Sequence, residues 1–180
     1  LQEGRVISFS GSSIDAERQT KPYIHAVNFT PDRRYLWADD LGTDQIHVFP
    51  VNDLEGENAY LPLLDEGNAQ DIYIKAGFGP RHLCFAPNGK RAYLLGELSG
   101  EVATISYENE QWQVMQILQV DSLNAGGSAD VHVSPDGRFV YTSHRLQGDG
   151  LSVMKVQDDG TLVKIGYQPT GIHPRNFVLT

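Results

Sequence analysis

The sequence predicts an all-β fold, a β-propeller built from four-stranded antiparallel blades. A hairpin-like segment recurs along the chain, alternating apolar segments follow each copy, and no window of about 11 residues has convincing helical periodicity. The copies are spaced by 56, 48 and 46 residues, and four strands in such a period are the content of one propeller blade. Leucine-rich and β-helix solenoids are the main alternative, but their repeats are shorter.

The recurring segment has the pattern of a β-hairpin. Its complete copies align without gaps at residues 27–37, 83–93 and 131–141, and a fourth begins at Phe177. Each complete copy has alternating apolar residues, Pro followed by Asp or Asn, a basic residue, and an aromatic residue six positions after the Pro. The alternation predicts a half-buried strand, and the Pro with its polar neighbour supplies the turn.

Two further strands complete each blade. Third strands are expected at residues 45–49, 101–107 and 151–156, and a fourth strand at, for example, residues 112–118. The stretch from Asn52 to Gly67 is expected to be a long loop. Residues 6–9 have the pattern of the late part of a blade, and Thr180 falls inside an inner strand. Residues 1–180 are therefore expected to form a single partial propeller domain of roughly four blades. The remaining blades of the larger, seven-bladed ring are expected to pack against this part.

Composition excludes several classes of function. The 180 residues carry a formal net charge of −9, which argues against a nucleic-acid partner. No apolar run approaches the roughly 20 residues that cross a membrane. The one cysteine, Cys84, cannot form an internal disulfide, which favours a reducing compartment. A cytoplasmic location is expected, with the periplasm left open because the first residues show neither an initiator Met nor a signal pattern.

The repeat places polar residues at one end of the blades. In an antiparallel hairpin the start of the first strand and the end of the second lie at the same end, so equivalent positions should ring one mouth of the channel. The residues expected to converge there are His25, Arg81, Glu97, Arg145 and Arg175, with His82 and Asp130 beside them and Asp39 and Asp40 close by.

Three arginines at one mouth of an acidic protein allow two interpretations. The guanidinium fork suits a carboxylate or a phosphate, which favours an anion-binding site. Alternatively, the arginines pair with Glu97 and Asp130 as structural links between blades. The spacing does not separate these interpretations.

Other chemistry has weaker support. The six histidines show no close zinc-ligand pattern, and we expect no metal and no cofactor. His47 and His132 alternate with apolar neighbours and are expected to be satisfied strand or surface residues, whereas His144 allows either orientation. Cys84 lies in mid-strand and is expected to be a packed thiol.

Four motifs in order resemble the seven-bladed propeller lactonases, the family of bacterial 6-phosphogluconolactonase and the fungal carboxy-muconate lactonizing enzyme. They are Gly79-Pro80-Arg81-His82, Gly96-Glu97-Leu98-Ser99, the segment from Ser134 to Arg145, and His173-Pro174-Arg175-Asn176. The resemblance runs from about Gln19 to Thr180 and implies that about half of a seven-bladed ring is present. The family often has Pro-His-x-His where this chain has Pro22-Tyr23-Ile24-His25.

The resemblance implies a lactonase that hydrolyses a sugar-acid lactone, 6-phosphogluconolactone to 6-phosphogluconate, with a small anionic lactone as its partner. The catalytic residues it implies are His25, Glu97, Arg81 and Arg145, and the expected substrate-binding residues are Arg81, His82, Arg145, Arg175 and Asp130. His25 is favoured as the general base, because arginines lower the pKa of a carboxylate such as Glu97. The alternatives are a non-catalytic ligand- or protein-binding propeller and a muconate-type lactonizing enzyme.

Overall fold

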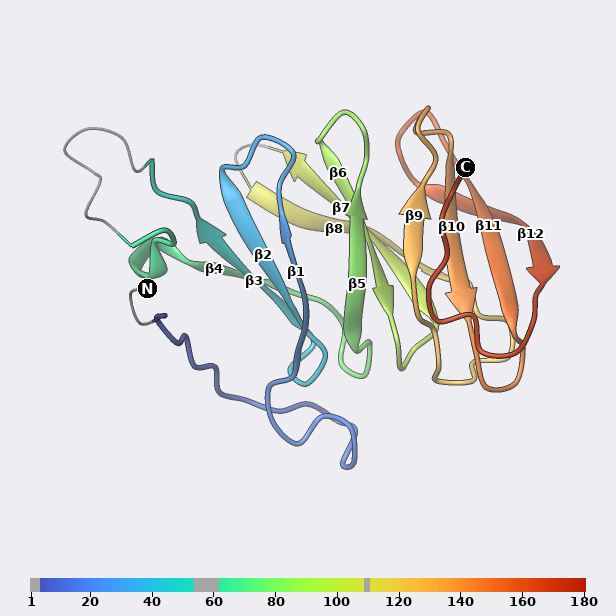
Figure 1. The fold of residues 1–180 in the computed structure, drawn as a ribbon, viewed down its shortest axis with the longest axis horizontal. Coiled ribbons are helices and arrows are strands. Elements are labelled where there is room, and N and C mark those ends of the chain that lie inside the picture. The colour runs from blue at the N-terminus through green and yellow to red at the C-terminus, as the bar shows by residue number, and fades with distance from the viewer. Residues whose placement is uncertain (1–3, 54–61, 109–110) are drawn as a thin grey trace.

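The computed structural model describes residues 4–53, 62–108 and 111–180. Within them, twelve strands form three four-stranded antiparallel sheets that stand side by side (Figure 1). The helical structure in the described part of the chain is one 3-10 turn, Glu66–Asn68. The predicted all-β fold of four-stranded blades is confirmed.

Each sheet runs in chain order from one edge to the other. The first contains β1 (Ile24–Phe29), β2 (Tyr35–Asp40), β3 (Gln45–Pro50) and β4 (Gln70–Tyr73). The second contains β5 (Pro80–Phe85), β6 (Arg91–Gly96), β7 (Glu101–Glu108) and β8 (Gln111–Gln119). The third contains β9 (Val131–Val133), β10 (Phe139–His144), β11 (Gly150–Val156) and β12 (Leu162–Pro169). The three predicted hairpins are therefore β1–β2, β5–β6 and β9–β10.

The residue after each Pro holds the hairpin turn closed. Asp32 Oδ1 accepts hydrogen bonds from the Thr30 hydroxyl (2.6 Å) and the Arg34 amide (3.1 Å), and Asp136 makes the equivalent pair. The next residue of each turn has positive φ, which two of the three copies provide with Gly. This chemistry explains why one short pattern recurs at the same end of all three sheets.

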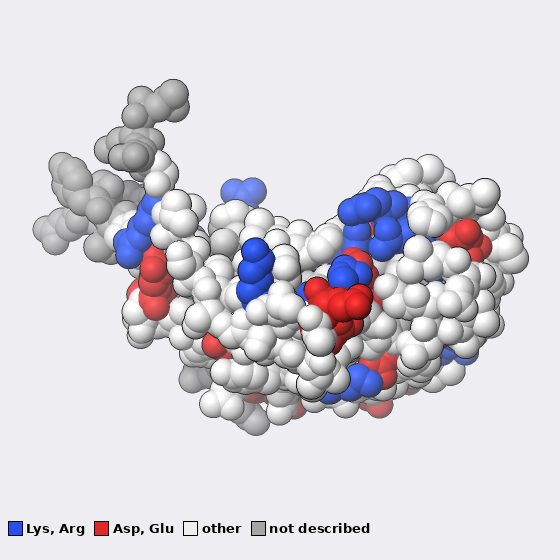
Figure 2. Space-filling view, turned by 90° about the horizontal axis from the view of Figure 1, so that it is seen from below, with Lys and Arg blue, Asp and Glu red and all other residues white. Residues whose placement is uncertain are grey.

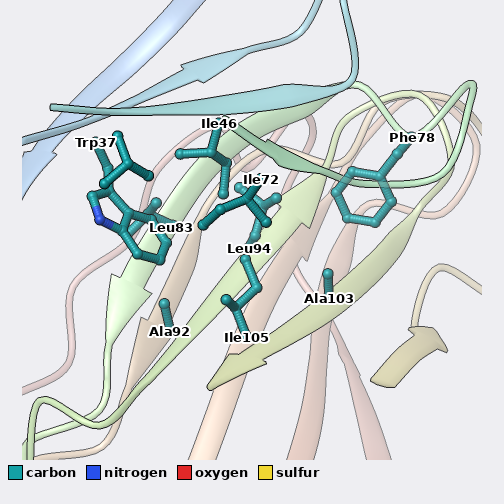
Figure 3. Close-up of a cluster of buried hydrophobic side chains, with 10 residues drawn as sticks. Trp37, Ile46, Ile72, Phe78, Leu83, Ala92, Leu94, Ala103 and Ile105 are labelled. Carbon is teal, nitrogen blue, oxygen red and sulfur yellow. The ribbon is translucent and has the colours of Figure 1, made fainter. Parts of the chain in front are cut away.

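The core lies between the sheets and follows the two-residue period of the strands. Leu94 faces the first sheet, where it packs with Trp37 and Ile46 (Figure 3). Its neighbours Tyr93 and Leu95 belong to a second buried cluster that includes residues of the third sheet. Because both faces of the middle sheet are packed, the three sheets have fixed relative positions and their corresponding ends stay aligned.

Two predictions about the ends of the chain were wrong in detail. Residues 6–9 form no strand; instead Phe9 stacks on His47 with ring centroids 4.3 Å apart. Residues 177–180 also form no strand, because no described segment pairs with them through a hydrogen-bond ladder; Phe177 packs on His132 with centroids 4.6 Å apart. Three complete blades with these flanking segments still agree with the expected content of roughly four blades.

Part of the predicted long loop, which connects β3 to β4 within the first sheet, lies outside the described residues at positions 54–61. Its described ends approach each other, since Val51 and Leu64 form an isolated β-bridge.

Among the described residues, no helix has the length and apolar character needed to cross a membrane.

Candidate active site at the end where the first strands begin

The predicted site residues lie where β1, β5 and β9 begin and β2, β6 and β10 end. Figure 2 looks at this end of the sheets and shows acidic and basic side chains gathered side by side. The same end carries two β-bulges. Ile24 pairs with Asp40 and Ala26 with Asp39, so His25 is the extra residue of the first bulge. The second bulge has Arg81 as its extra residue, between Pro80 and His82. Bulges often redirect a side chain next to an active site.

Arg81 and Glu97 form the most buried ion pair of the site. Arg81 is 1% exposed, and its Nε lies 2.6 Å from Glu97 Oε2. Arg81 Nη1 donates to the carbonyl of Ala129 in the third blade and lies 3.3 Å from His82 Nε2. Burial lowers the pKa of Arg81, and Glu97 opposes that effect. Arg81 thus joins the second blade to the third and fixes one oxygen of Glu97.

The second oxygen of Glu97 is held by two more arginines. Arg18 Nη2 lies 2.8 Å from Glu97 Oε1, and Arg145 Nη2 lies 3.9 Å from the same oxygen. Burial alone would raise the pKa of Glu97, but the hydrogen bond from Arg18 and the charge of Arg81 outweigh it and lower the pKa. Glu97 is therefore an anion at neutral pH and a weak acceptor of protons.

Arg145 is also engaged by the protein. It is 9% exposed, and its Nε donates to the carbonyl of Gly127 at 2.8 Å. Arg81 thus fits the structural interpretation of the rim arginines, since two of its donors bind protein acceptors, whereas Arg145 commits its Nε and has Nη2 3.9 Å from Glu97. Arg175 differs, because it is exposed and makes no hydrogen bond or ion pair within the described part of the chain. Its positive charge lowers the pKa of both His25 and Arg81, which places it near them.

His25 has an environment that favours its neutral form. Its Nδ1 is buried and has no hydrogen-bond partner among the described residues. Its ring lies edge-on to that of His82, with centroids 5.1 Å apart. Burial first, and the positive charge of Arg81 next, lower the pKa of His25 from 6.5 to about 4. The ring is therefore an unprotonated acceptor at neutral pH.

His82 is fixed by Asp130. His82 Nδ1 lies 2.8 Å from Asp130 Oδ1, while the other carboxylate oxygen lies 3.0 Å from His132 Nε2 and accepts from the Asn176 side chain. Burial raises the pKa of Asp130, but hydrogen bonds from His82 and His132 outweigh it and bring the pKa to about 2. Asp130 is thus a permanent anion that orients His82 from behind.

Asp40 supports the strand rather than adding to the cluster, and the carboxylate oxygens of Asp39 are buried without a hydrogen-bond partner among the described residues. Asp40 accepts from the amides of Tyr23 (2.8 Å) and Gly42 (2.9 Å) and lies 3.3 Å from His47 Nε2. Asp39 is fully buried, and burial raises its pKa well above the ordinary value. Asp40 therefore fixes the approach of the chain to His25.

Three residues with open or structural predictions lie in the sheets, where His144 and His47 are buried and Cys84 is half-buried. His144 lies between Ser128 Oγ (2.8 Å) and Thr142 Oγ1 (2.9 Å), which settles its orientation away from the cluster. His47 is satisfied by Asp40 and by Asp71, 2.6 Å from its Nδ1. Burial raises the pKa of the Cys84 thiol, as expected for a packed cysteine.

Sequence reasoning missed Arg18, which precedes the first hairpin and has no equivalent in the repeat. It lines a cavity of about 260 Å³ together with Glu17, Tyr23, His25 and Leu41. A larger cavity of about 460 Å³ lies at the opposite end of the sheets, between the hairpin turns that contain Pro31 and Pro87. None of the predicted site residues lines that larger cavity.

The chain resembles curated lactonases along its length. The family model described as Lactonase, 7-bladed beta-propeller matches residues 1–180. The chain is 38% identical to the 6-phosphogluconolactonase of Formosa agariphila over 177 residues, 96% of this chain and 49% of that protein. It is 36% identical to the 6-phosphogluconolactonase of Bacillus subtilis over 170 residues, 90% and 45% of the two chains.

Solved structures agree. A Bacteroides fragilis protein described as a candidate 6-phosphogluconolactonase matches with a TM-score of 0.91 and 47% identity, over 98% of this chain and 50% of that one. The periplasmic gluconolactonase of Pseudomonas aeruginosa matches with a TM-score of 0.80 and 32% identity, over 94% and 48%. The chain spans about half the length of the curated relatives it matches. With the family model matching all 180 residues, this chain belongs to the seven-bladed β-propeller lactonase family.

Proposed function

We propose that the intact protein hydrolyses a sugar-acid lactone, 6-phosphogluconolactone to 6-phosphogluconate, at the end of the blades that carries His25. The observation that supports this most is the state of His25 itself: a bulge residue with an unpartnered buried Nδ1 and a pKa of about 4. An unprotonated imidazole can take a proton from water, which ester hydrolysis requires. The names of two curated relatives support the substrate class.

His25 and two arginines carry out the steps of the proposed reaction. His25 accepts a proton from water as the water oxygen attacks the lactone carbonyl carbon. Arg145 and Arg175 stabilise the negative charge that develops on the carbonyl oxygen. His25 then returns the proton to the ring oxygen as the carbon–oxygen bond breaks, which leaves a carboxylic acid that ionises.

Arg81 and Glu97 position the other groups. The two N–H donors of Arg81 described above are already used on protein acceptors, so its effect on catalysis runs through Glu97. Glu97 gathers Arg18, Arg81 and Arg145 around one carboxylate and keeps these guanidinium groups in place. His82, fixed by Asp130, packs against the His25 ring and limits its rotation.

The test is a lactone-hydrolysis assay on the intact protein, with spontaneous hydrolysis subtracted. We expect hydrolysis of 6-phosphogluconolactone that His25→Gln lowers by roughly 10²–10⁴-fold. Absence of hydrolysis by the wild-type protein overturns the proposal. A protein that binds the lactone without turnover is then a non-catalytic propeller, and one that acts only on a carboxy-muconate is a lactonizing enzyme. The compartment stays a prediction, and the Pseudomonas aeruginosa relative is named as periplasmic.

A further inference from the structure

Arg18 lies in a short segment that its own hydrogen bonds fold into a fixed shape. The amide of Ser13 donates to the carbonyl of Gln19 at 2.9 Å. Asp15 Oδ1 accepts from the amides of Glu17 (3.0 Å) and Arg18 (2.9 Å). These hydrogen bonds restrain the backbone of Arg18, which reduces the entropy lost when its side chain binds a ligand.

The same segment is anchored to the first blade and, through Asp44, to the turn that leads into the second blade. Gln19 is fully buried, and its Nε2 donates to the carbonyl of Leu41 at 2.9 Å. The Ser13 hydroxyl donates to Asp44 Oδ2 at 2.5 Å. Asp44 also accepts from the amides of Gly77 and Gly79, both at 2.7 Å, in the turn that leads into β5 and Arg81. Asp44 thus connects the segment that carries Arg18 to the turn that precedes Arg81.

The guanidinium of Arg18 is held on one side and open on the other. Its Nη2 lies 2.8 Å from Glu97 Oε1, yet the side chain is 48% exposed. Its other N–H groups have no partner among the described residues. Arg81, by contrast, is 1% exposed. Arg18 therefore offers donors to a ligand in the cavity that it shares with His25, while Arg81 does not.

We infer that Arg18 binds a phosphate group on the lactone and so sets the preference for phosphorylated over unphosphorylated sugar lactones. A guanidinium presents paired donors that match phosphate oxygens, and Glu97 holds this one in place. Glu17 lines the same cavity, and its carboxylate opposes the attraction of an anion. The inference rests on the proposed function and assigns its substrate specificity to a residue outside the repeat.

The experiment measures kcat and KM of the intact protein with 6-phosphogluconolactone and with unphosphorylated gluconolactone. Arg18→Gln is expected to lower kcat/KM for the phosphorylated lactone about 10-fold more than kcat/KM for gluconolactone, because any effect through Glu97 is common to both substrates. Arg18→Lys should restore part of the affinity, and Glu17→Gln should lower KM for the phosphorylated lactone alone. Arg138→Gln is the matched control, since Arg138 also pairs with a carboxylate, Asp136, but in an exposed hairpin turn.

Two results separate this inference from the proposed function. If the wild-type protein hydrolyses both lactones and Arg18→Gln changes both equally or changes neither, Arg18 does not select the phosphate and the inference is overturned alone. If the wild-type protein hydrolyses neither lactone, the proposed function is overturned, and this inference with it.

Discussion

Arg81 Nε lies 2.6 Å from Glu97 Oε2 in an ion pair almost closed to solvent, with Arg81 1% and Glu97 8% exposed. Two charges taken out of water cost free energy that their attraction offsets only with good geometry and further hydrogen bonds. Arg18 and the Ala129 carbonyl supply those bonds. The pair links the second blade to the third and holds Arg18 and Arg145 near the same carboxylate, so a structural network and the proposed catalytic site share the same residues.

Arg81→Lys keeps the positive charge and loses the planar fork. We expect a folded protein whose kcat/KM is lower by about 10- to 150-fold, because one charge-assisted contact is worth roughly 1.5–3 kcal/mol. The measurement combines steady-state kinetics with urea unfolding. Arg138→Lys in the exposed pair with Asp136 is the control and should change stability by less than about 0.5 kcal/mol. Equal effects of the two substitutions would show that the burial of Arg81 is unimportant.

Gly96→Ala tests how closely the chain packs beside Glu97. A Cβ at position 96 would lie 2.5 Å from the carbonyl oxygen of Phe78 and 2.6 Å from Ser99 Oγ, so the backbone must shift. We expect a loss of roughly 1–3 kcal/mol in the free energy of unfolding and lower kcat/KM, as for other overpacked sites. Gly171→Ala is the control, because nothing lies within 4 Å of its Cβ. Unchanged activity in Gly96→Ala would mean that Glu97 tolerates displacement.

The burial of His144 leads to a prediction of how the free energy of unfolding depends on pH. Burial lowers its pKa from 6.5 to about 4, so the unfolded chain binds the proton more tightly than the folded one. The contribution of His144 to the free energy of unfolding is therefore fully present above pH 6.5 and is lost as the pH drops toward 4. Its size is about 3 kcal/mol. Urea unfolding between pH 4 and pH 7 should show this slope, and His144→Gln should flatten it. A slope that is the same in both proteins would contradict the account.

The sequence predicts the blades well because their determinants are local. Alternating side chains and the Pro-Asp turn at Pro135 specify a hairpin without information from elsewhere in the chain. The repeat also predicts which residues lie close together in the folded protein, because equivalent positions in packed blades lie at the same end of the sheets. His25, Arg81 and Glu97 meet for that reason, and their convergence was predicted from spacing.

What the sequence does not reveal depends on contacts outside the repeat. Arg18 reaches Glu97, 79 residues away, from a segment with no equivalent in the other blades. Asp44 joins Ser13 to Gly79 by hydrogen bonds that no pattern indicates. Sequence spacing also does not show which side chains are buried, so it could not decide whether the Arg81 side chain contacts a ligand or the protein. The same limit applies to residues 6–9, whose strand-like composition ends in a stacking contact of Phe9 rather than in a strand.

The pH dependence of kcat/KM for His25→Gln, Glu97→Gln and the wild-type intact protein tests the central claim most directly. With His25 as the base, wild-type kcat/KM should be constant near neutral pH and fall as the pH drops through about 4, where the imidazole is protonated. His25→Gln should lose this limb and roughly 10²–10⁴-fold in rate. Glu97→Gln should keep the limb and move its midpoint to lower pH, because Glu97 raises the pKa of His25. A limb that survives in His25→Gln and disappears in Glu97→Gln would contradict the account and make Glu97 the base.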